Sequence, residues 1–143
     1  LYGCVRPFHA VEPYRLEMGA KLAVDDAPDL YAFWSDKLAR AIAPAGSNTT
    51  IVNLASVEYA KAVLPHLAGD ATVVTCLFGE GIRNGKPIQR STASKKARGS
   101  MVRWMAENKL EDASELTAFN IGYRHIPELS DKNTLVFMNA QAQ

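Results

Sequence analysis

Hydrophobic and polar positions change period along this sequence, and each change marks an expected element. From Leu30 to about Ala43, apolar residues recur at spacings of three and four, which predicts a helix with one apolar face. Asp29 stands where an N-cap is expected, and Pro44 and Gly46 follow the last apolar position. The apolar positions of this helix are Leu30, Phe33, Trp34, Leu38, Ala41 and Ile42.

Short runs of β-branched and apolar residues predict the first two strands, at Thr50–Ala55 and Ala71–Phe78. Between them, Ser56 is expected to cap a helix that runs from Val57 to about Leu67.

A hairpin and a third helix are predicted next. Asn84-Gly85 is a strong turn signal, so Lys86–Arg90 would return as a strand. Ser94 is expected to cap a helix over about Lys95–Asn108. Its buried stripe would comprise Ala97, Met101, Trp104 and Met105.

The last part of the chain predicts a short helical turn at Ala113–Leu116 and two strands, Phe119–Ile126 and Thr134–Asn139. The first 28 residues, by contrast, include Pro7, Pro13 and Pro28. We expect a looping segment there, with a short strand at Arg15–Leu22, because interior prolines break a helix.

This order of elements indicates a mixed α/β (α+β) fold, in which helices pack on a mixed sheet. The 143 residues suffice for one domain, and 48% apolar with 22% charged residues exclude a disordered chain. The opening Leu1-Tyr2-Gly3 resembles the middle of a folded segment, so we expect residues 1–143 to be an incomplete fragment of a larger single-domain fold. Cys4 and Cys76 are expected to be buried free thiols.

Charge is strongly segregated, although the formal net charge is only +1. Between Arg83 and Lys109 there are eight bases and a single acid, Glu107, and the remainder carries 8 bases and 14 acids. Such segregation favours a surface that meets an anion. The bases are Arg83, Lys86, Arg90, Lys95, Lys96, Arg98, Arg103 and Lys109.

The densest basic run is Lys95-Lys96-Ala97-Arg98-Gly99, at the predicted start of the third helix. Backbone N–H groups and basic side chains there would together bind a phosphate or carboxylate. Gly99 costs about 1 kcal/mol in a helix, which close approach by a ligand or a neighbouring segment would explain. A solvated basic face is the alternative.

A second candidate site lies in the looping segment, which holds Arg6, Tyr14, Arg15 and Glu17. Arg binds anions bidentately and Tyr stacks on bases. Pairing of the two arginines with Glu12 and Glu17 is the simpler interpretation.

The remaining candidates are weak. The three histidines, His9, His66 and His125, lack ligand spacing, and no Cys-x-x-Cys occurs. We therefore predict no metal site and no cofactor. Ser56 follows a strand, where nucleophiles are found, but capping explains it better.

Several blocks of residues stand in fixed order over nearly the whole chain. They are Tyr2-Gly3 with Arg6-Pro7, Pro13-Tyr14-Arg15-Leu16-Glu17-Met18-Gly19, Asn53-Leu54-Ala55-Ser56 with Glu58-Tyr59, Lys95-Lys96-Ala97-Arg98-Gly99, and Phe119-Asn120 with Gly122-Tyr123 and Leu135-Val136-Phe137. Together they resemble the YaaA family of bacterial peroxide-stress proteins, of which this chain would be the C-terminal part. His9 stands where the family usually has Asp, and one residue is missing between Asn120 and Gly122.

The resemblance implies a cytosolic protein of the hydrogen peroxide stress response that limits free iron and oxidative damage. It also implies DNA binding through a basic cleft, mainly to the phosphate backbone. At the matching positions, Lys95, Lys96 and Arg98, with Arg6 and Arg15, would bind the DNA, and Tyr14 and Glu17 would line the cleft. Arg103, which belongs to the basic stretch, is expected to bind DNA with them. The other expected partner is the N-terminal part of the same protein.

An enzyme that acts on a nucleotide, a nucleobase or another small anion is the alternative, with Glu17 as a general base beside Arg15 and Arg98. Direct iron sequestration is disfavoured, because no cluster of ligands has suitable spacing. No segment has the length of a membrane helix, so no membrane partner is expected.

Overall fold

The computed structural model describes residues 2–6 and 8–141. The chain divides into two compact units, and each is described by itself. Unit 1 comprises Leu1–Thr49 and Ala55–Thr72, and unit 2 comprises Thr50–Leu54 and Val73–Gln143. Leu1 and Pro7, which belong to the opening stretch of the sequence, lie outside the described residues.

The first predicted helix of unit 1 is divided into two, α1 (Leu30–Trp34) and α2 (Lys37–Ile42). The predicted cap is confirmed, because Asp29 Oδ1 accepts the Ala32 N–H at 2.8 Å. The prediction of one continuous helix is wrong. Ser35 has a φ of +43°, outside the helical region, so the helix ends before it.

The second predicted helix of unit 1 is shorter than expected. It consists of α3 (Val57–Ala60), followed by a 3₁₀ turn, η1 (Leu64–His66). Pro65 has no N–H to continue an α-helical ladder. Ser56 stands at the N-cap position but makes no side-chain capping bond, so its predicted capping role is wrong.

No strand forms at Arg15–Leu22, which corrects that prediction. The Met18 N–H donates instead to the Glu58 carboxylate at 2.7 Å, and the Tyr59 hydroxyl donates to the Leu16 carbonyl at 3.1 Å. Met18 is buried with Leu30 and Ala62 in the small core of this unit. Side chains of α3 therefore replace a partner strand, and the segment is a loop held in place.

Unit 2 is built on a four-stranded sheet in the order β1-β2-β6-β5. The strands are β1 (Thr50–Asn53), β2 (Thr72–Gly79), β5 (Tyr123–His125) and β6 (Thr134–Asn139). β2 pairs with β6 in parallel, with Phe78 beside Phe137, whereas β5 pairs with β6 antiparallel. The predicted mixed sheet with packed helices is confirmed, and β5 is shorter than the predicted Phe119–Ile126 strand.

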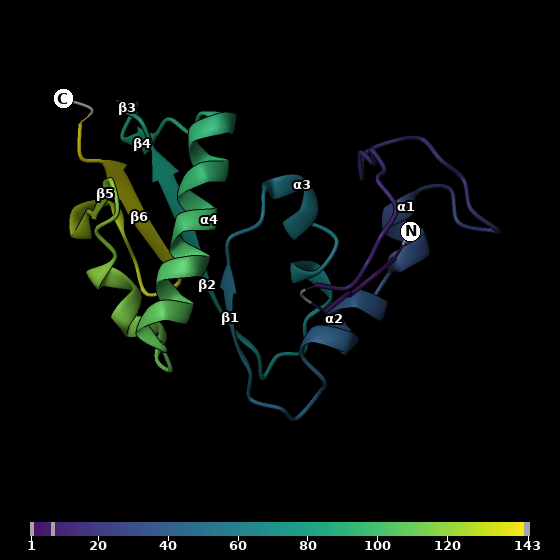
Figure 1. Ribbon diagram of the computed structural model, residues 1–143. Coiled ribbons are helices and arrows are strands. Elements are labelled where there is room, and N and C mark those ends of the chain that lie inside the picture. Colours follow the sequence, from purple (N-terminus) through teal and green to yellow (C-terminus); the bar gives the residue numbers. More distant parts are fainter. Residues whose placement is uncertain (1, 7, 142–143) are drawn as a thin grey trace. The chain divides into compact units, whose positions relative to one another are not determined.

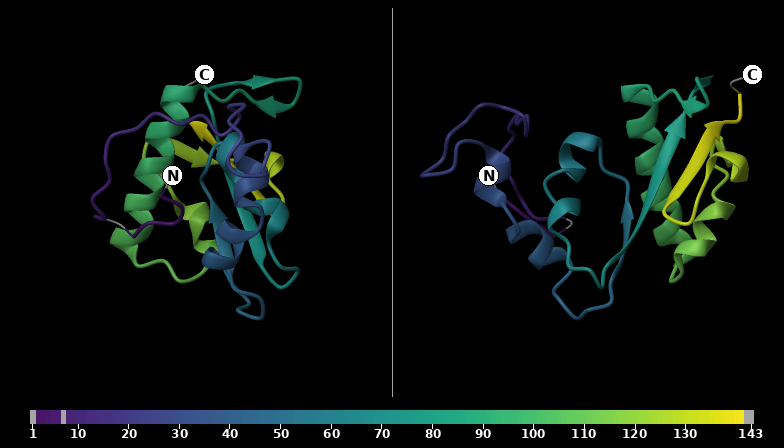
Figure 2. Two further views of the ribbon diagram at one scale, coloured as in Figure 1. Left: turned by 90° about the vertical axis from the view of Figure 1, so that its right-hand side faces the viewer. Right: turned by 180° about the vertical axis from the view of Figure 1, so that it is seen from behind.

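Helix α4 (Ser91–Asn108) covers one face of β2 and β6, as Figure 1 and the rear view in Figure 2 show. Ala97 and Met101 are buried against Phe78 and Phe137, whose rings stack at 5.4 Å. Trp104 and Met105 pack at the edge of this core, so the predicted stripe is confirmed.

The predicted start of this helix is wrong, because α4 begins at Ser91 and not after Ser94. Ser94 is buried inside the helix, and its hydroxyl donates to the Phe78 carbonyl at 3.3 Å. A hydroxyl that would have capped the helix thus ties it to β2.

The predicted hairpin is confirmed as β3 (Ile82–Arg83) paired with β4 (Lys86–Pro87), although β4 is shorter than the predicted Lys86–Arg90 strand. Asn84 and Gly85 have φ values of +52° and +73°, as a two-residue hairpin turn requires. The predicted turn near Ala113 is the 3₁₀ helix η2 (Ala113–Ala118), and a further 3₁₀ turn, η3 (Pro127–Leu129), precedes β6.

The two cysteines differ in environment. Cys76 is buried in β2 as predicted, and burial raises the pKa of its thiol to about 12. Cys4 is exposed, so the prediction that it is buried is wrong. Its segment contributes no strand to the described sheets and leaves the thiol at the surface.

Candidate functional site

At one end of unit 2 the hairpin lies beside the start of α4 (Figure 1), and we call the exposed cations of these two elements the basic surface. Lys95 and Lys96 are exposed on α4, and Arg90 precedes its first turn. Arg83 and Lys86 are exposed on the two arms of the hairpin. These five cations come from one continuous stretch of chain that contains no acid, so their positive potentials add.

Two open hollows lie within this basic surface. One, of about 600 Å³, is lined by Arg90, Lys96 and the small side chains of Ser91, Thr92 and Ala93. The other, of about 620 Å³, is lined by Arg83, Asn84, Lys86, Pro87, Ile88 and Gln89. Each hollow thus presents two cations beside neutral hydrogen-bonding groups, which suits an anionic backbone.

The basic run does not lie at the helix start, which corrects the prediction that free backbone N–H groups of the first turn and these basic side chains bind an anion together. The first turn consists of Ser91, Thr92 and Ala93, and Lys95 is the fifth residue of α4. The dipole effect falls off within the first turn, so attraction at Lys95 and Lys96 depends on their own charges.

Arg98 differs from the two lysines because it is half-buried and its guanidinium points toward Gln89, which lies between β4 and α4. Its terminal nitrogen donates to Gln89 Oε1 at 3.4 Å, a long bond. Its Nε is buried and has no hydrogen-bond partner among the described residues. Arg98 therefore contributes to the edge of the basic surface and not to its exposed face.

Arg103 lies further along α4 and is already paired. Its Nε donates to Glu107 Oε1 at 2.7 Å, and this hydrogen bond and the charge of Glu107 raise the pKa of Arg103. The pair is exposed, so it is worth little and a phosphate could compete for the guanidinium.

The other predicted site residues, Arg6, Tyr14, Arg15 and Glu17, belong to unit 1 and are all exposed. Arg15 pairs with Glu17 at 3.0 Å on the surface, so the simpler interpretation is confirmed for Arg15. It is wrong for Arg6, which makes no ion pair with Glu12 or Glu17 in the described part of the chain. Glu17 therefore lacks the desolvated environment that tunes a general base. A cleft shared with Lys95 and Arg98 of unit 2 stays a prediction.

Sequence reasoning missed a polar network that joins the carboxyl ends of β2 and β6. The Tyr123 hydroxyl donates to one oxygen of Glu80, and Asn139 Nδ2 donates to the other at 2.7 Å. Burial, together with the Glu80 carboxylate, raises the pKa of Tyr123 to about 12, so the hydroxyl stays a donor at neutral pH. An acid directly after a buried strand was the one signal in the sequence.

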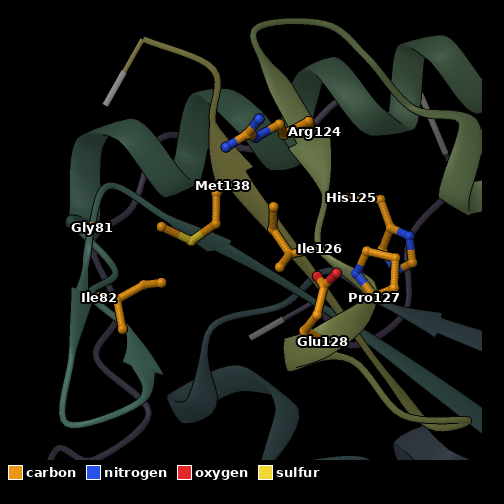
Figure 3. A pocket seen from close by; sticks show the side chains of 8 residues that line it. All are labelled: Gly81, Ile82, Arg124, His125, Ile126, Pro127, Glu128 and Met138. Carbon is orange, nitrogen blue, oxygen red and sulfur yellow. The ribbon is translucent and has the colours of Figure 1, made fainter. Parts of the chain in front are cut away.

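A hollow of about 600 Å³ opens beside this network, between the hairpin and β5 (Figure 3). Ile82, Ile126 and Met138 form its apolar part, and Arg124 and Glu128 project from opposite sides of it in Figure 3. Its mixed lining suits a small molecule more than an extended polyanion.

The three histidines lie in different surroundings. His9 and His66 are exposed, whereas His125 is half-buried beside Phe137, and its Nε2 has no partner within the described part of the chain. Over residues 2–6 and 8–141, no group of three or more His, Cys, Asp or Glu side chains could hold a metal ion. None of the helices in that part is both long and apolar enough to span a bilayer.

Comparison with known proteins identifies the family. The family described as "Peroxide stress protein YaaA" matches residues 1–129. A UPF0246 protein of Desulfitobacterium hafniense is 44% identical over 143 residues, which are 99% of this chain and 56% of that protein. A UPF0246 protein of Pediococcus pentosaceus is 44% identical over 96% of this chain and 54% of its own length. A UPF0246 protein of a Ruegeria species is 45% identical over 85% of this chain and 49% of its own length.

The match extends through both units and includes the loop motif, the Asn53–Tyr59 block and the basic run of α4. This chain spans about half the length of the curated relatives that it matches. The family resemblance of its motifs is confirmed, and the chain belongs to the YaaA (UPF0246) family of peroxide stress proteins.

Proposed function

We propose that this protein binds DNA through the phosphate backbone, with the basic surface of α4 and the β3–β4 hairpin as the contact. The observation that carries the proposal is the grouping of Arg83, Lys86, Arg90, Lys95 and Lys96 on adjoining elements of unit 2. Regularly repeated phosphates are the ligand that best satisfies several exposed cations at once.

The side chains of this surface favour binding that depends little on sequence. Lysines act as point charges, and most of the residues beside them in the two hollows are small or apolar. Of the described residues that line the hollows, Asn84 and Gln89 carry amides, too few to read a series of base edges. Phosphate contacts therefore dominate.

The setting that we propose is the cytosol under peroxide stress, where the protein would limit oxidative damage to DNA. What supports this setting is the description of the family as peroxide stress proteins. An effect on free iron would follow indirectly from the same response, since we propose DNA and not iron as the ligand.

The test is the salt dependence of duplex affinity, measured by fluorescence anisotropy for the full chain and for a Lys95→Ala/Lys96→Ala variant. Each phosphate contact contributes about 0.9 to the slope of log affinity against log salt concentration. The double variant should therefore lose about 1.8 from the slope. Arg98→Ala should have less effect, because the Arg98 side chain is half-buried against Gln89.

A Lys21→Ala/Lys132→Ala variant is the matched control. Both residues are exposed and lie outside the basic surface, so the control removes the same charge from the chain. Equal slopes for the two double variants would contradict the proposed surface. Absence of any salt-sensitive duplex binding by the folded wild type would contradict DNA binding itself.

A further inference from the structure

We propose that unit 1 carries a second, different nucleic-acid contact: a stacking site for an unpaired base on the ring of Tyr14. This inference rests on the proposed DNA binding and deepens it, because it names the form of DNA that unit 1 takes. Single-stranded or locally unpaired DNA is the ligand, since the faces of its bases are free to stack.

The site begins with two tyrosines that pack on each other at the surface. The rings of Tyr2 and Tyr14 are 5.6 Å apart and inclined at 47°. Tyr14 is 52% exposed and Tyr2 is 43% exposed, although each is a large apolar ring that burial would stabilise. The pair thus forms a small aromatic platform, and Tyr14 is the more exposed of the two residues.

One hydrogen bond and one close backbone approach hold the Tyr2 side of the platform in place. The Tyr2 hydroxyl accepts the Glu12 N–H at 3.1 Å, which holds the ring of Tyr2 against the loop. Gly3 has a φ of +64°, and a Cβ there would lie 3.1 Å from the Trp34 ring. The chain therefore passes closely over Trp34, and this brings Tyr2 to its place.

The other end of the loop is fixed by α3. The Tyr59 hydroxyl donates to the Leu16 carbonyl at 3.1 Å, and Glu58 accepts the Met18 N–H at 2.7 Å. Met18 itself is buried. Tyr14 is thus only two residues from the anchored carbonyl of Leu16. Little conformational entropy of the loop is therefore lost when a base stacks on its ring.

Charge argues for a base and against a run of phosphates at this position. The segment from Tyr2 to Glu17 contains two arginines and two glutamates, so its formal net charge is zero. It lacks the excess of cations that makes the surface of unit 2 attractive to phosphates. The contact that its aromatic rings offer is sequence-tolerant stacking, which depends weakly on salt.

Arg15 adds one adaptable group beside the platform. Its side chain is 90% exposed and pairs with Glu17, whose side chain is 67% exposed. Such a surface pair is worth little, so the guanidinium can turn to the phosphate or the face of a bound nucleotide. One base on Tyr14 with one contact from Arg15 is the arrangement that we infer.

The experiment compares Tyr14→Leu with Tyr14→Phe, the matched control that keeps an aromatic face. Anisotropy is measured with a labelled single strand and with a duplex, each at low and at high salt. Tyr14→Leu should weaken single-strand binding at least about fivefold at both salt concentrations, because stacking contributes that much or more per base. Tyr14→Phe should keep wild-type affinity, and duplex affinity should change in neither variant.

A single strand made of abasic sites distinguishes two causes of weaker binding by Tyr14→Leu, namely loss of base stacking and damage to the loop. It keeps the phosphates and removes the bases, so wild type and Tyr14→Leu should bind it equally. Unequal binding of the abasic strand, or equal loss for single strand and duplex, would overturn the inference. Unchanged single-strand affinity in Tyr14→Leu would overturn it too.

The two proposals fail in different ways. If the chain binds duplex with the expected slope but Tyr14→Leu has no effect on single strands, only the stacking site is wrong. If neither form of DNA binds, the proposed function and the inference that rests on it both fail. The Lys95→Ala/Lys96→Ala variant should bind both duplex and single-stranded DNA more weakly than wild type. The loss of affinity should become smaller as the salt concentration rises.

Discussion

Gly99 is a glycine in the middle of a long helix, on the exposed side of α4 beside Lys95 and Lys96. A Cβ added there would meet no atom within 4 Å. Close approach by a neighbouring described segment, one of the two explanations offered by the sequence, is therefore wrong. Approach by a ligand stays a prediction, and it can be tested because the folded protein itself has room for alanine.

Gly99→Ala should stabilise the protein by about 1 kcal/mol, because glycine loses more backbone entropy in a helix. The free energy of unfolding, measured with urea, checks this. Ala106→Gly is the matched control on the same exposed face and should change stability by a similar amount in the opposite direction. A lower stability of Gly99→Ala would contradict the open environment.

Weaker duplex binding by a stabilised Gly99→Ala variant would show that DNA approaches this backbone.

At the scale of elements, Glu80 ties the end of β2 to β5 and β6. Its two oxygens accept from Tyr123 and Asn139, and the ring of Tyr123 packs edge-on against Phe78 at 5.4 Å. The Glu80 N–H also donates to the Ile88 carbonyl at 2.8 Å, just after the hairpin. This one residue therefore positions the hairpin, with its exposed cations, on the sheet.

Tyr123→Phe should keep the ring packing and lose the bond to Glu80, at a cost of about 1 kcal/mol in the free energy of unfolding. The cost should depend on pH. The pKa of Tyr123 is raised to about 12 in the folded protein, against about 10 in the unfolded chain. The protonated hydroxyl thus contributes its full stability below pH 10 and loses it as pH rises toward 12.

Urea unfolding of both proteins at a series of pH values measures this difference. The two proteins differ only at residue 123. The difference between their free energies of unfolding therefore isolates the contribution of the Tyr123 hydroxyl. If this difference in the free energy of unfolding stays constant between about pH 8 and the highest accessible pH, Tyr123 is not the donor to Glu80.

At the scale of the whole molecule, the two units place their cysteines in opposite environments. Cys4 is exposed in unit 1, and Cys76 lies in the core of unit 2 beside Val74 and Phe78. Burial raises the pKa of the Cys76 thiol to about 12, so this thiol stays protonated and unreactive in the folded state. Reaction at Cys76 therefore reports the opening of unit 2.

A thiol reagent should modify Cys4 rapidly in the native protein and Cys76 only as unit 2 unfolds. Mass spectrometry of the peptides, followed across a urea series, measures the two rates. Cys4→Ser should remove the rapid phase and leave the urea dependence of Cys76 unchanged. Rapid modification of Cys76 without denaturant would contradict the packed core of unit 2.

Local sequence pattern predicted most of unit 2. The strands predicted at Ala71–Phe78 and Thr134–Asn139 form within one residue of those bounds, and the Asn84-Gly85 turn and the buried stripe of α4 form as predicted. Strand formation and tight turns depend on side-chain burial and backbone freedom over a few residues, which a sequence displays directly. The motifs of the family, including its basic run, are likewise continuous stretches of sequence and need no folding to be recognised.

Unit 1 was predicted less well, because its chain is held by contacts between distant residues. Hydrogen bonds to Glu58 and from Tyr59 replace the strand expected at Arg15–Leu22, and Ser35 divides a helix whose apolar spacing is continuous. Periodicity records which side of an element is buried, and it does not record which distant group will satisfy a backbone N–H.

The sequence by itself determined the family, the mixed α/β class and the segregation of charge into one stretch. Only the tertiary structure decided that this stretch covers the hairpin and the open face of α4, that Arg98 turns toward Gln89, and that Tyr2 meets Tyr14. Charge and motif are properties of the covalent chain. Exposure, pairing and the meeting of residues nine or more positions apart arise only when folding brings their side chains together.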